Sequence, residues 1–453
     1  MKLAYYCGVG FAILLYGCAG GSGGGGRGRP SANDNASQNT NAAPNENTNT
    51  ANDNATNTNS GPPDLTGPPG EPRGGLSSSE RAEFDAGRAM FEHRFTALEG
   101  LGPQLNATSC ASCHDQGGIG GGGERFRNTW FVARSLEDGT IAPIYTTFYL
   151  PSYGPSEVFP AYAGDDHPPT PASADVVAQR NSPPLYGVGL FELIDDTVLL
   201  ALQDPGDADG DGISGVANIV DGRVGRFGYK SQGSSIEAFV RGTLQEHIGI
   251  TSEPLDGVAA LQLEPDSRTG WRRVIDRMLE WVDFAAPAHA QIIIPGQPTS
   301  ADGDEVPEPE INRSDLAALV AFVQRLAAPR RGSVIDAVTR GAAIFDEIGC
   351  STCHVPELAT SLGPIHAYSD LLLHDMGAEL ADGVRLGRAA GGEFRTAPLW
   401  GLCRSAPYLY DGRADTIEDA IAAHGGEAEA SRGRYVDLSD EQRSDLIEFV
   451  NSL

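Results

Sequence analysis

The sequence predicts a mainly α fold made of two similar helical units, the first enlarged by a loop-rich insertion. One observation is a repeated opening helix, since Gly87 and Phe91 in "EFDAGRAMF" have the same spacing as Gly341 and Phe345 in "AVTRGAAIF". Another is a repeated, amphipathic closing helix with apolar residues at matching places: Leu319, Phe322, Val323 and Leu326, then Leu446, Phe449, Val450 and Leu453. The third is the spacing C-x-x-C-H, which occurs once in each unit.

The N-terminus has the features of a bacterial export signal. Lys2 supplies a positive charge, and the apolar stretch 9–16 is too short to span a bilayer as a helix. Gly17 precedes Cys18 in "LLYGC", which resembles a lipobox, where cleavage leaves a lipidated cysteine. We therefore expect residues 1–17 to be a lipoprotein signal peptide, with ordinary signal cleavage nearby as the alternative. The protein is then periplasmic, lipid-anchored to the bacterial outer membrane, or exported, and it meets a membrane only through the lipid.

A low-complexity segment follows the expected cleavage point. Residues 18–76 are rich in Gly, Asn, Thr and Pro and contain almost no large apolar side chains. Such a composition cannot bury a core, so it predicts a disordered, flexible linker. We expect the folded part of the chain to begin at Ser77.

Charge and length limit the functions that remain. The chain has 453 residues, with 61 acidic and 32 basic side chains and a formal net charge of −29. This length allows two domains. So much negative charge repels nucleic acid, which excludes it as a partner, and attracts basic proteins or cations.

The two C-x-x-C-H pentads point to covalent haem attachment. Of seven cysteines, Cys7 leaves with the signal and Cys18 with the lipid; four of the remaining five stand in the pentads. A disulfide redox pair or half of a zinc site is the alternative, but neither chemistry needs a histidine directly after the second cysteine. In c-type attachment the two thiols bond to the porphyrin and the histidine binds the iron. The predicted ligands of two haem c groups are Cys110, Cys113, His114, Cys350, Cys353 and His354.

An opening and a closing helix packed around a haem make a cytochrome c-like domain. The repeat therefore predicts an N-terminal domain over residues 77–330 and a C-terminal domain over residues 331–453. The first is about twice as long as the second, and its surplus after His114 is rich in Gly, Pro and turn signals.

A possible calcium loop lies within that surplus. In "DPGDADGDGISG" the residues Asp207, Asp209 and Asp211 alternate, and Gly212 stands sixth, as at the start of an EF-hand loop. The match is partial because the twelfth position is Asn218 rather than glutamate. A plain Asp/Gly turn is the alternative to a Ca²⁺ site.

Longer motifs resemble a known family. The runs "FRTAPLWGLCRSAPYLYDGRADTIEDAIAAHGGEA", "LLLHDMG" and "NSPPLYGVGLFELIDD" are similar to those of the bacterial di-haem c-type oxidoreductases often labelled thiol oxidoreductases. That family is related to the di-haem cytochrome c peroxidases and to the di-haem enzyme that matures methylamine dehydrogenase. The chain departs from it at Tyr410, where relatives often have histidine, and at Cys403, where the residue is usually small. The resemblance implies a peroxidase-like enzyme with a substrate-activating N-terminal haem and an electron-accepting C-terminal haem.

The resemblance also suggests a sixth ligand for the C-terminal haem. The peroxidases hold that ligand, usually methionine, at the place of His424, which follows a helix beginning at Thr416. His424 is therefore expected opposite His354. A histidine that only complements the helix dipole is the alternative, and His374 and Met376 are rival ligands.

Glu246 is the expected acid/base of the N-terminal haem. It lies in "TLQEHIGIT", where the peroxidases carry the glutamate that moves a proton during O–O cleavage. His247 is either its neighbour in the pocket or a second axial ligand, and Glu192 is a weaker candidate for the acid/base. The alternative for Glu246 and His247 is a solvated helix surface.

Two functions remain open at this point. The first is an oxidoreductase acting on peroxide or another small substrate, with a small redox protein such as a cytochrome as electron donor or acceptor. The second is a non-enzymatic electron carrier with two six-coordinate irons. Relatives place a tryptophan between the haems, and Trp130, Trp271, Trp281 and Trp400 are the candidates. Arg395 and Arg413 can pair with haem propionates, or can be ordinary surface arginines.

Overall fold

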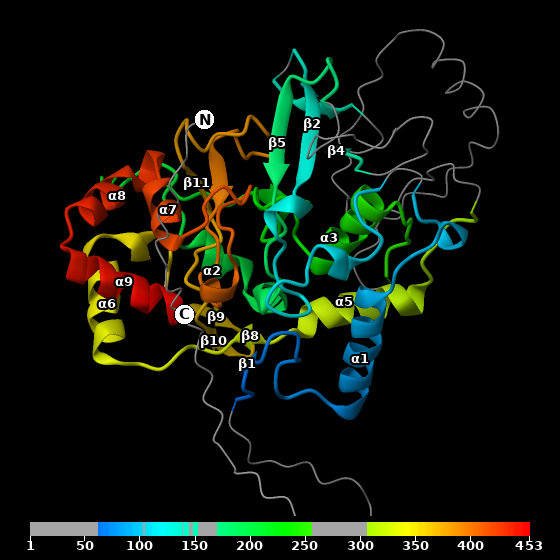
Figure 1. Cartoon of the computed structure of the whole chain (residues 1–453), viewed down its shortest axis with the longest axis horizontal. Helices are drawn as coiled ribbons and strands as arrows, with labels where there is room; N and C mark the ends of the chain where they lie inside the picture. The colour runs from blue at the N-terminus through cyan, green and yellow to red at the C-terminus, as the bar shows by residue number, and fades with distance from the viewer. Residues whose placement is uncertain (1–61, 103–104, 138, 145–147, 153–169, 256–305) are drawn as a thin grey trace, which may run out of the picture. The chain divides into compact units, whose positions relative to one another are not determined.

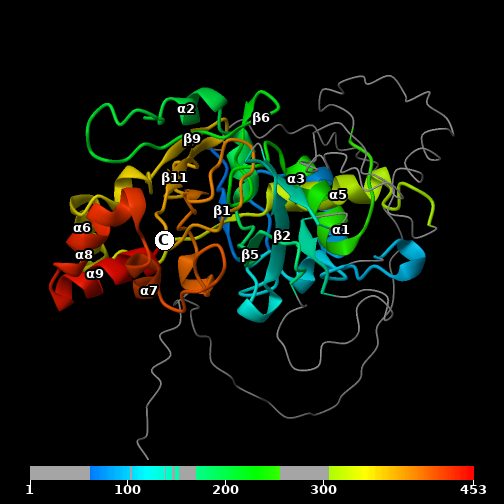
Figure 2. The same cartoon turned by 90° about the horizontal axis from the view of Figure 1, so that it is seen from above.

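Two crossed helix pairs organise the chain, whose computed structural model describes residues 62–102, 105–137, 139–144, 148–152, 170–255 and 306–453. In the first pair, α1 (Ser78–Glu92) packs on α5 (Arg313–Arg325); in the second, α6 (Asp336–Glu347) packs on α9 (Asp440–Asn451). Figures 1 and 2 show these pairs on either side of the strands.

Glycine lets each pair cross closely. A Cβ atom on Gly87 would lie 1.9 Å from the carbonyl oxygen of Ala318, and one on Gly341 would lie 2.0 Å from that of Asp445. Neither distance leaves room for a side chain. The predicted repeat therefore corresponds to two equivalent helix crossings.

The repeated apolar residues of the closing helices face these crossings. Each of these residues is no more than 5% exposed: Leu319, Phe322, Val323, Leu326, Leu446, Phe449, Val450 and Leu453. Phe91 lies 4.9 Å from Phe322, and Phe345 lies 5.3 Å from Phe449, between ring centroids. The apolar residues of both closing helices therefore belong to the core, as their helical spacing predicts.

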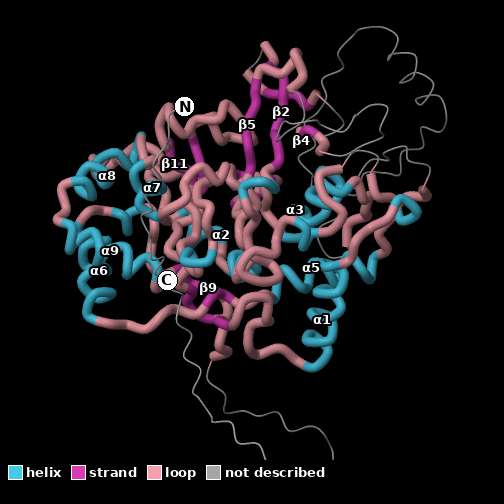
Figure 3. Tube along the Cα trace, in the orientation of Figure 1, coloured by secondary structure: helices cyan, strands magenta, loops and turns pink. Residues whose placement is uncertain are grey.

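Strands are more abundant than the predicted mainly α fold allows. A four-stranded antiparallel sheet is centred on β2 (Thr129–Ser135), which pairs with β5 (Val176–Arg180), β3 (Ile141–Pro143) and β4 (Tyr149–Leu150). Figure 3 shows strands beside helices. The fold is thus mixed, because β-branched and aromatic residues in this part of the surplus pair across strands.

The remaining elements are short. The other strands form two-stranded pairs: β1 (Thr66–Gly67) with β8 (Ala328–Pro329), β6 (Ile219–Val220) with β7 (Arg223–Val224), β9 (Leu358–Thr360) with β10 (Gly363–Ile365), and β11 (Leu373–Asp375) with β12 (Glu393–Arg395). The other helices and helical turns are η1 (Ala97–Glu99), η2 (Cys110–Ser112), η3 (Arg125–Arg127), η4 (Val188–Leu193), α2 (Asp196–Leu200), α3 (Ile236–Thr243), η5 (Leu244–Ile248), η6 (Cys350–Thr352), η7 (Leu402–Arg404), α7 (Ile417–Ala422), η8 (Gly426–Ala428) and α8 (Glu429–Val436).

The packed chain begins before the predicted Ser77. Leu65 is buried in the main core, and Thr66 pairs with Ala328 in the parallel β1–β8 ladder. The linker prediction is therefore wrong for this stretch, because backbone pairing holds a segment that has few apolar side chains. The rest of the expected linker, the signal peptide and Cys18 lie outside the described residues.

Both helix pairs belong to one compact unit, Pro63–Leu453. The predicted division at residues 330 and 331 therefore stays a prediction. Among the helices that the structure describes, none has the length and apolar character needed to cross a membrane.

Candidate functional site

Each pentad forms a short helical turn, η2 after α1 and η1 in the first unit, and η6 directly after α6 in the second. The backbone N–H of His114 donates to Cys110 O at 3.1 Å, and that of His354 donates to Cys350 O at 3.0 Å. His114 and His354 each lie 6.3 Å from the phenylalanine of the opening helix, Phe91 or Phe345, between ring centroids. The two sites therefore share one local geometry.

The pentad cysteines are free thiols. Burial raises the pKa of Cys110 and Cys350 to about 12, so both are protonated at neutral pH. The thiols form no disulfide redox pair, and among the described residues no pentad brings three ligand atoms together as a zinc site requires.

One cavity of about 480 Å³ is lined by residues of both pentads. Its other lining residues include His247, Trp400 and His424. Residues far apart in sequence therefore meet around one space, as a pair of large cofactors needs.

Three cavity histidines contact a backbone carbonyl through the same ring nitrogen, Nδ1. Nδ1 of His114 contacts Gly121 O at 3.1 Å, Nδ1 of His354 contacts Tyr368 O at 2.9 Å, and Nδ1 of His424 contacts Ala420 O at 2.7 Å. A carbonyl only accepts, so each Nδ1 carries the proton and each Nε2 keeps its lone pair. This is the arrangement of histidines that bind metals.

His424 is positioned by the end of α7. The side chain of Thr416 caps the helix by accepting from Asp419 N at 3.0 Å, and His424 follows its last turn. Burial lowers the pKa of His354 to about 4, and the nearby His424 opposes its protonation further. The two imidazoles are thus neighbours in the cavity wall, as the resemblance implies.

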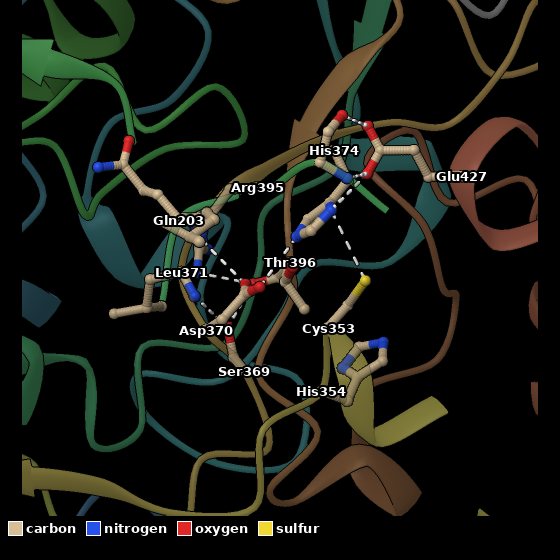
Figure 4. Close-up of polar contacts among 12 residues, drawn as sticks. Gln203, Cys353, His354, Ser369, Asp370, Leu371, His374, Arg395, Thr396 and Glu427 are labelled. Carbon is tan, nitrogen blue, oxygen red and sulfur yellow. Dashed lines mark hydrogen bonds and ion pairs between the residues drawn. The ribbon is translucent and has the colours of Figure 1, made fainter. Parts of the chain in front are cut away.

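His374 has neither nitrogen free. Its Nε2 contacts Asp370 Oδ2 at 2.9 Å, and its Nδ1 contacts Glu427 Oε2 at 2.7 Å (Figure 4). In this structure His374 therefore has no lone pair with which to bind iron, so the structure does not support it as the alternative ligand. Met376 lines the cavity and packs against the buried cluster of Leu380, Phe394 and Tyr410.

His247 has the opposite arrangement. Asn106 Oδ1 accepts from the backbone N–H of Ser152 at 3.0 Å, which turns its amide nitrogen toward Nδ1 of His247 at 3.5 Å. An amide N–H only donates, so Nδ1 of His247 accepts and its Nε2 carries the proton. Burial, followed by repulsion from His114, lowers the pKa of His247 to about 4, so the ring is neutral.

Glu246 stands one residue away in the π-helical turn η5. Burial raises the pKa of its carboxyl to about 8, although the residue as a whole is only half-buried. Its charge acts on Tyr149, whose ring lies 4.1 Å from that of His247. His247 lines the cavity, whereas Glu246 lies just outside the lining.

The cavity wall also offers cations to an anionic group. Arg226 is 1% exposed and lines the cavity; it pairs with Asp196, yet its Nε and Nη1 have no partner among the described residues. Such orphaned donors fit a carboxylate of a bound cofactor. Arg395 also lines the cavity, with Nε on Gly228 O at 3.0 Å. The residues present therefore fit haem, with thiols, imidazoles and guanidinium groups at its thioether, iron and propionate positions.

Other sequence candidates do not reach the cavity. Arg413 pairs with Asp411 at 2.6 Å and is outside the lining. Glu192 accepts from Ile236 N at 2.6 Å and from Gln324 Nε2 at 2.7 Å, so it joins α3 to α5.

Trp400 is the described tryptophan in the cavity wall, stacked on Phe191 with ring centroids 5.4 Å apart. Trp130 lies in β2 outside the lining. Trp271 and Trp281 lie outside the described residues.

The acidic loop brings a different set of carboxylates together. Oxygen atoms of Asp204, Asp207 and Asp209 lie within 4.8 Å of one another. Asp211 is not in this group and instead accepts from Ile213 N at 2.8 Å. The carboxylates that come together are therefore those of Asp204, Asp207 and Asp209, whereas the EF-hand comparison predicted Asp207, Asp209 and Asp211.

Sequence reasoning missed Arg226, Asn106 and the carboxylates around His374. Arg226 stands in "GRFGYKSQ", a run that also resembles the di-haem oxidoreductases and could have drawn attention to it. The other positions depend on contacts between distant segments, for which the sequence carries no local pattern.

Solved structures include three with low similarity to this chain. A MauG-like protein associated with microbial copper homeostasis is 18% identical over 84% of this chain and 89% of its own, with a TM-score of 0.35. The diheme peroxidase BthA from Burkholderia thailandensis is 14% identical over 82% and 86%, with a TM-score of 0.36. Hydrazine synthase from Kuenenia stuttgartiensis is 22% identical over 31% of this chain, which spans 56% of that protein's chain, with a TM-score of 0.23.

The sequence itself gives the stronger assignment. Comparison with curated proteins finds no match. A family model described as "Di-haem oxidoreductase, putative peroxidase" matches residues 172–272 and 298–453, more than half of the chain. The match starts after the first pentad and includes the second. On this match, and with the first pentad upstream of it, the chain belongs to the di-haem oxidoreductase family, whose members carry two haems.

Proposed function

We propose that the protein is an exported, peroxidase-like enzyme with two covalently attached haems. The observation that carries the proposal is the contrast among four of the five described histidines that line the cavity. His114, His354 and His424 each offer an Nε2 lone pair, whereas Nε2 of His247 carries a proton. Three histidines would therefore be available to bind two haem irons, and His247 would stay free to face a substrate.

Haem, when bound at the N-terminal site, supplies an iron at which the O–O bond of peroxide is broken, and at the C-terminal site an iron that passes electrons. Cys110, Cys113, Cys350 and Cys353 would hold the two groups as thioethers. His114 would bind the first iron, and His354 and His424 would bind the second. Trp400, in the wall shared by both sites, is the proposed bridge for electrons.

Glu246 and His247 provide the proton chemistry on the open side. A peroxide molecule, two protons and two electrons from a small redox protein such as a cytochrome give two molecules of water. For the O–O bond to break, a proton must be taken from one peroxide oxygen and delivered to the other, which leaves as water; the Glu246 carboxyl would carry that proton. The Nε2–H of His247 donates a hydrogen bond that orients the substrate.

Replacing Asn106 with aspartate tests this assignment. Aspartate accepts from Nδ1 of His247, which moves the lone pair to Nε2 and makes the ring a ligand. We expect the EPR spectrum of the oxidised protein to show one high-spin ferric haem that responds to peroxide, and Asn106→Asp to convert it to low-spin. Asn312→Asp, the same change at the N-cap of α5, is the matched control and should leave the spectrum unaltered.

Two low-spin signals that peroxide does not change would instead establish the electron carrier. Intact mass of the mature protein tests the haems themselves, and fewer than two attached macrocycles would overturn the whole proposal.

We also propose a lipid anchor at Cys18 and a Ca²⁺ site in the acidic loop. The carboxylates of Asp204, Asp207 and Asp209 support the second, since Ca²⁺ prefers several oxygen ligands. Calorimetric titration with Ca²⁺ should give one binding event that Asp207→Asn removes. Cys18→Ser should release the protein from the membrane fraction; a variant that stays bound would contradict the anchor.

A further inference from the structure

A buried ion cluster joins the two sides of the C-terminal haem site. His374 lies on β11, and its side chain is 4% exposed; Asp370 is equally buried, and Glu427 is 13% exposed. Figure 4 shows His374 between the two carboxylates, with Cys353 and His354 below it. Nothing in the proposed chemistry uses this cluster.

The hydrogen-bond partners fix the charge of His374. Ionised carboxylates only accept, and one contacts each ring nitrogen, so both nitrogens carry protons and the ring is a cation. Burial opposes this charge, but hydrogen bonds to Asp370, Cys353 and Glu427 raise the pKa of His374 to about 12. The cluster thus holds one positive and two negative charges away from water.

One end of the cluster is tied to the haem attachment turn. The backbone N–H of Asp370 donates to Cys353 O at 3.0 Å, and Nδ1 of His374 lies 3.6 Å from Cys353 Sγ. A thioether sulfur has no proton, so with haem attached His374 is the donor in that contact.

The other end is tied to the axial side. Glu427 stands three residues after His424, in the turn η8. Its carboxylate also accepts from Ser214 N at 3.0 Å and from Asp375 N at 3.2 Å. A Cβ atom on Gly426 would lie 2.1 Å from Asp375 O, so this turn is pressed against β11. The turn that follows His424 is therefore fixed through Glu427.

We propose that His374 is a positioning residue that keeps His424 on the iron of the C-terminal haem by clamping Glu427 to the attachment turn. This inference rests on the proposed role of His424. Removing the cation leaves two buried carboxylates without compensation, which expels Glu427 and loosens the turn that carries His424. The C-terminal haem then loses its sixth ligand.

The experiment compares oxidised, haem-loaded His374→Gln and Glu427→Gln with the parent protein by EPR and by potentiometric titration. We expect a rise of roughly tenfold or more in the high-spin fraction of the C-terminal haem and a shift in its midpoint potential. Added imidazole should restore the low-spin signal, since the vacancy is at the iron. His366→Gln and Glu429→Gln are matched controls at half-exposed or exposed ion pairs and should leave the spectrum unchanged.

His424→Gly separates failure of the clamp from failure of the ligand assignment. If His424→Gly removes the low-spin signal but His374→Gln and Glu427→Gln keep it, the clamp is wrong and the ligand stands. If His424→Gly keeps the low-spin signal, His424 is not the ligand, and the proposed clamp on His424 is wrong as well. Should His374→Gln attach fewer than two haems, Glu427→Gln decides, and an unchanged spectrum there overturns the clamp.

Discussion

Replacing Gly341 with alanine tests whether the C-terminal unit depends on the close crossing of α6 and α9. A Cβ atom there would lie 2.0 Å from Asp445 O and 2.6 Å from Cβ of Phe449. Ordinary contact begins at 3.4 Å, so the helices would have to separate by about 1.4 Å in a core that tolerates little added volume. We expect the free energy of unfolding to fall by about 1–3 kcal/mol, even after the ~1 kcal/mol that alanine gains over glycine inside a helix.

Gly433 provides the matched control for this substitution. It is exposed on α8, and a Cβ atom there would have no neighbour within 4 Å. Gly433→Ala should therefore raise the free energy of unfolding by roughly 0.5–1 kcal/mol. Urea denaturation followed by circular dichroism measures both. Equal stability of Gly341→Ala and the parent would refute the crossing, and Gly87→Ala in the first unit must show the same loss as Gly341→Ala.

Three further predictions concern the cavity. Glu246→Gln should lower the rate of peroxide reduction by a factor of about 10²–10⁴ and abolish the pH dependence of that rate. In the parent protein the rate should rise as the pH passes about 8, because burial raises the pKa of the Glu246 carboxyl to about 8 and only the ionised carboxylate can take a proton. Asp382→Asn should cost about 3–5 kcal/mol in urea denaturation, because Asp382 pairs with buried Arg180 at 2.6 Å and with Lys230 at 3.3 Å. Trp400→Phe should slow electron transfer between the haems in flash or stopped-flow measurements, with both haems retained.

Each of these has a contrary outcome. A peroxide rate in Glu246→Gln that still rises through pH 8 would assign the titration to another group. Full stability of Asp382→Asn would mean that the two cations reach water when unpaired. For comparison, Asp440→Asn removes an exposed pair with Arg443 and should change the stability by less than about 1 kcal/mol. Unchanged transfer in Trp400→Phe would exclude that ring as the bridge.

The helix crossings and the pentads could be predicted from the sequence because each depends on local spacing. Gly341 and Phe345 lie one turn apart on one helix, and the apolar residues of α9 repeat with the helical period, so burial follows from the pattern. The sheet around β2 was missed for the opposite reason. Its burial does not alternate cleanly, and its partner β5 lies beyond a long segment, so no short pattern marks the pairing.

The second histidine at each haem site shows where sequence reasoning ends. His424 follows α7, His247 lies within η5, and both were candidate ligands. What separates them is one atom: Nδ1 of His424 meets a carbonyl of its own helix, whereas Nδ1 of His247 meets the amide of Asn106. The first contact is local and the second joins distant segments. A duplicated scaffold can therefore keep equivalent helix crossings and attachment turns while a single distant side chain gives the two histidines opposite tautomers, which under the proposed function would decide which iron stays open.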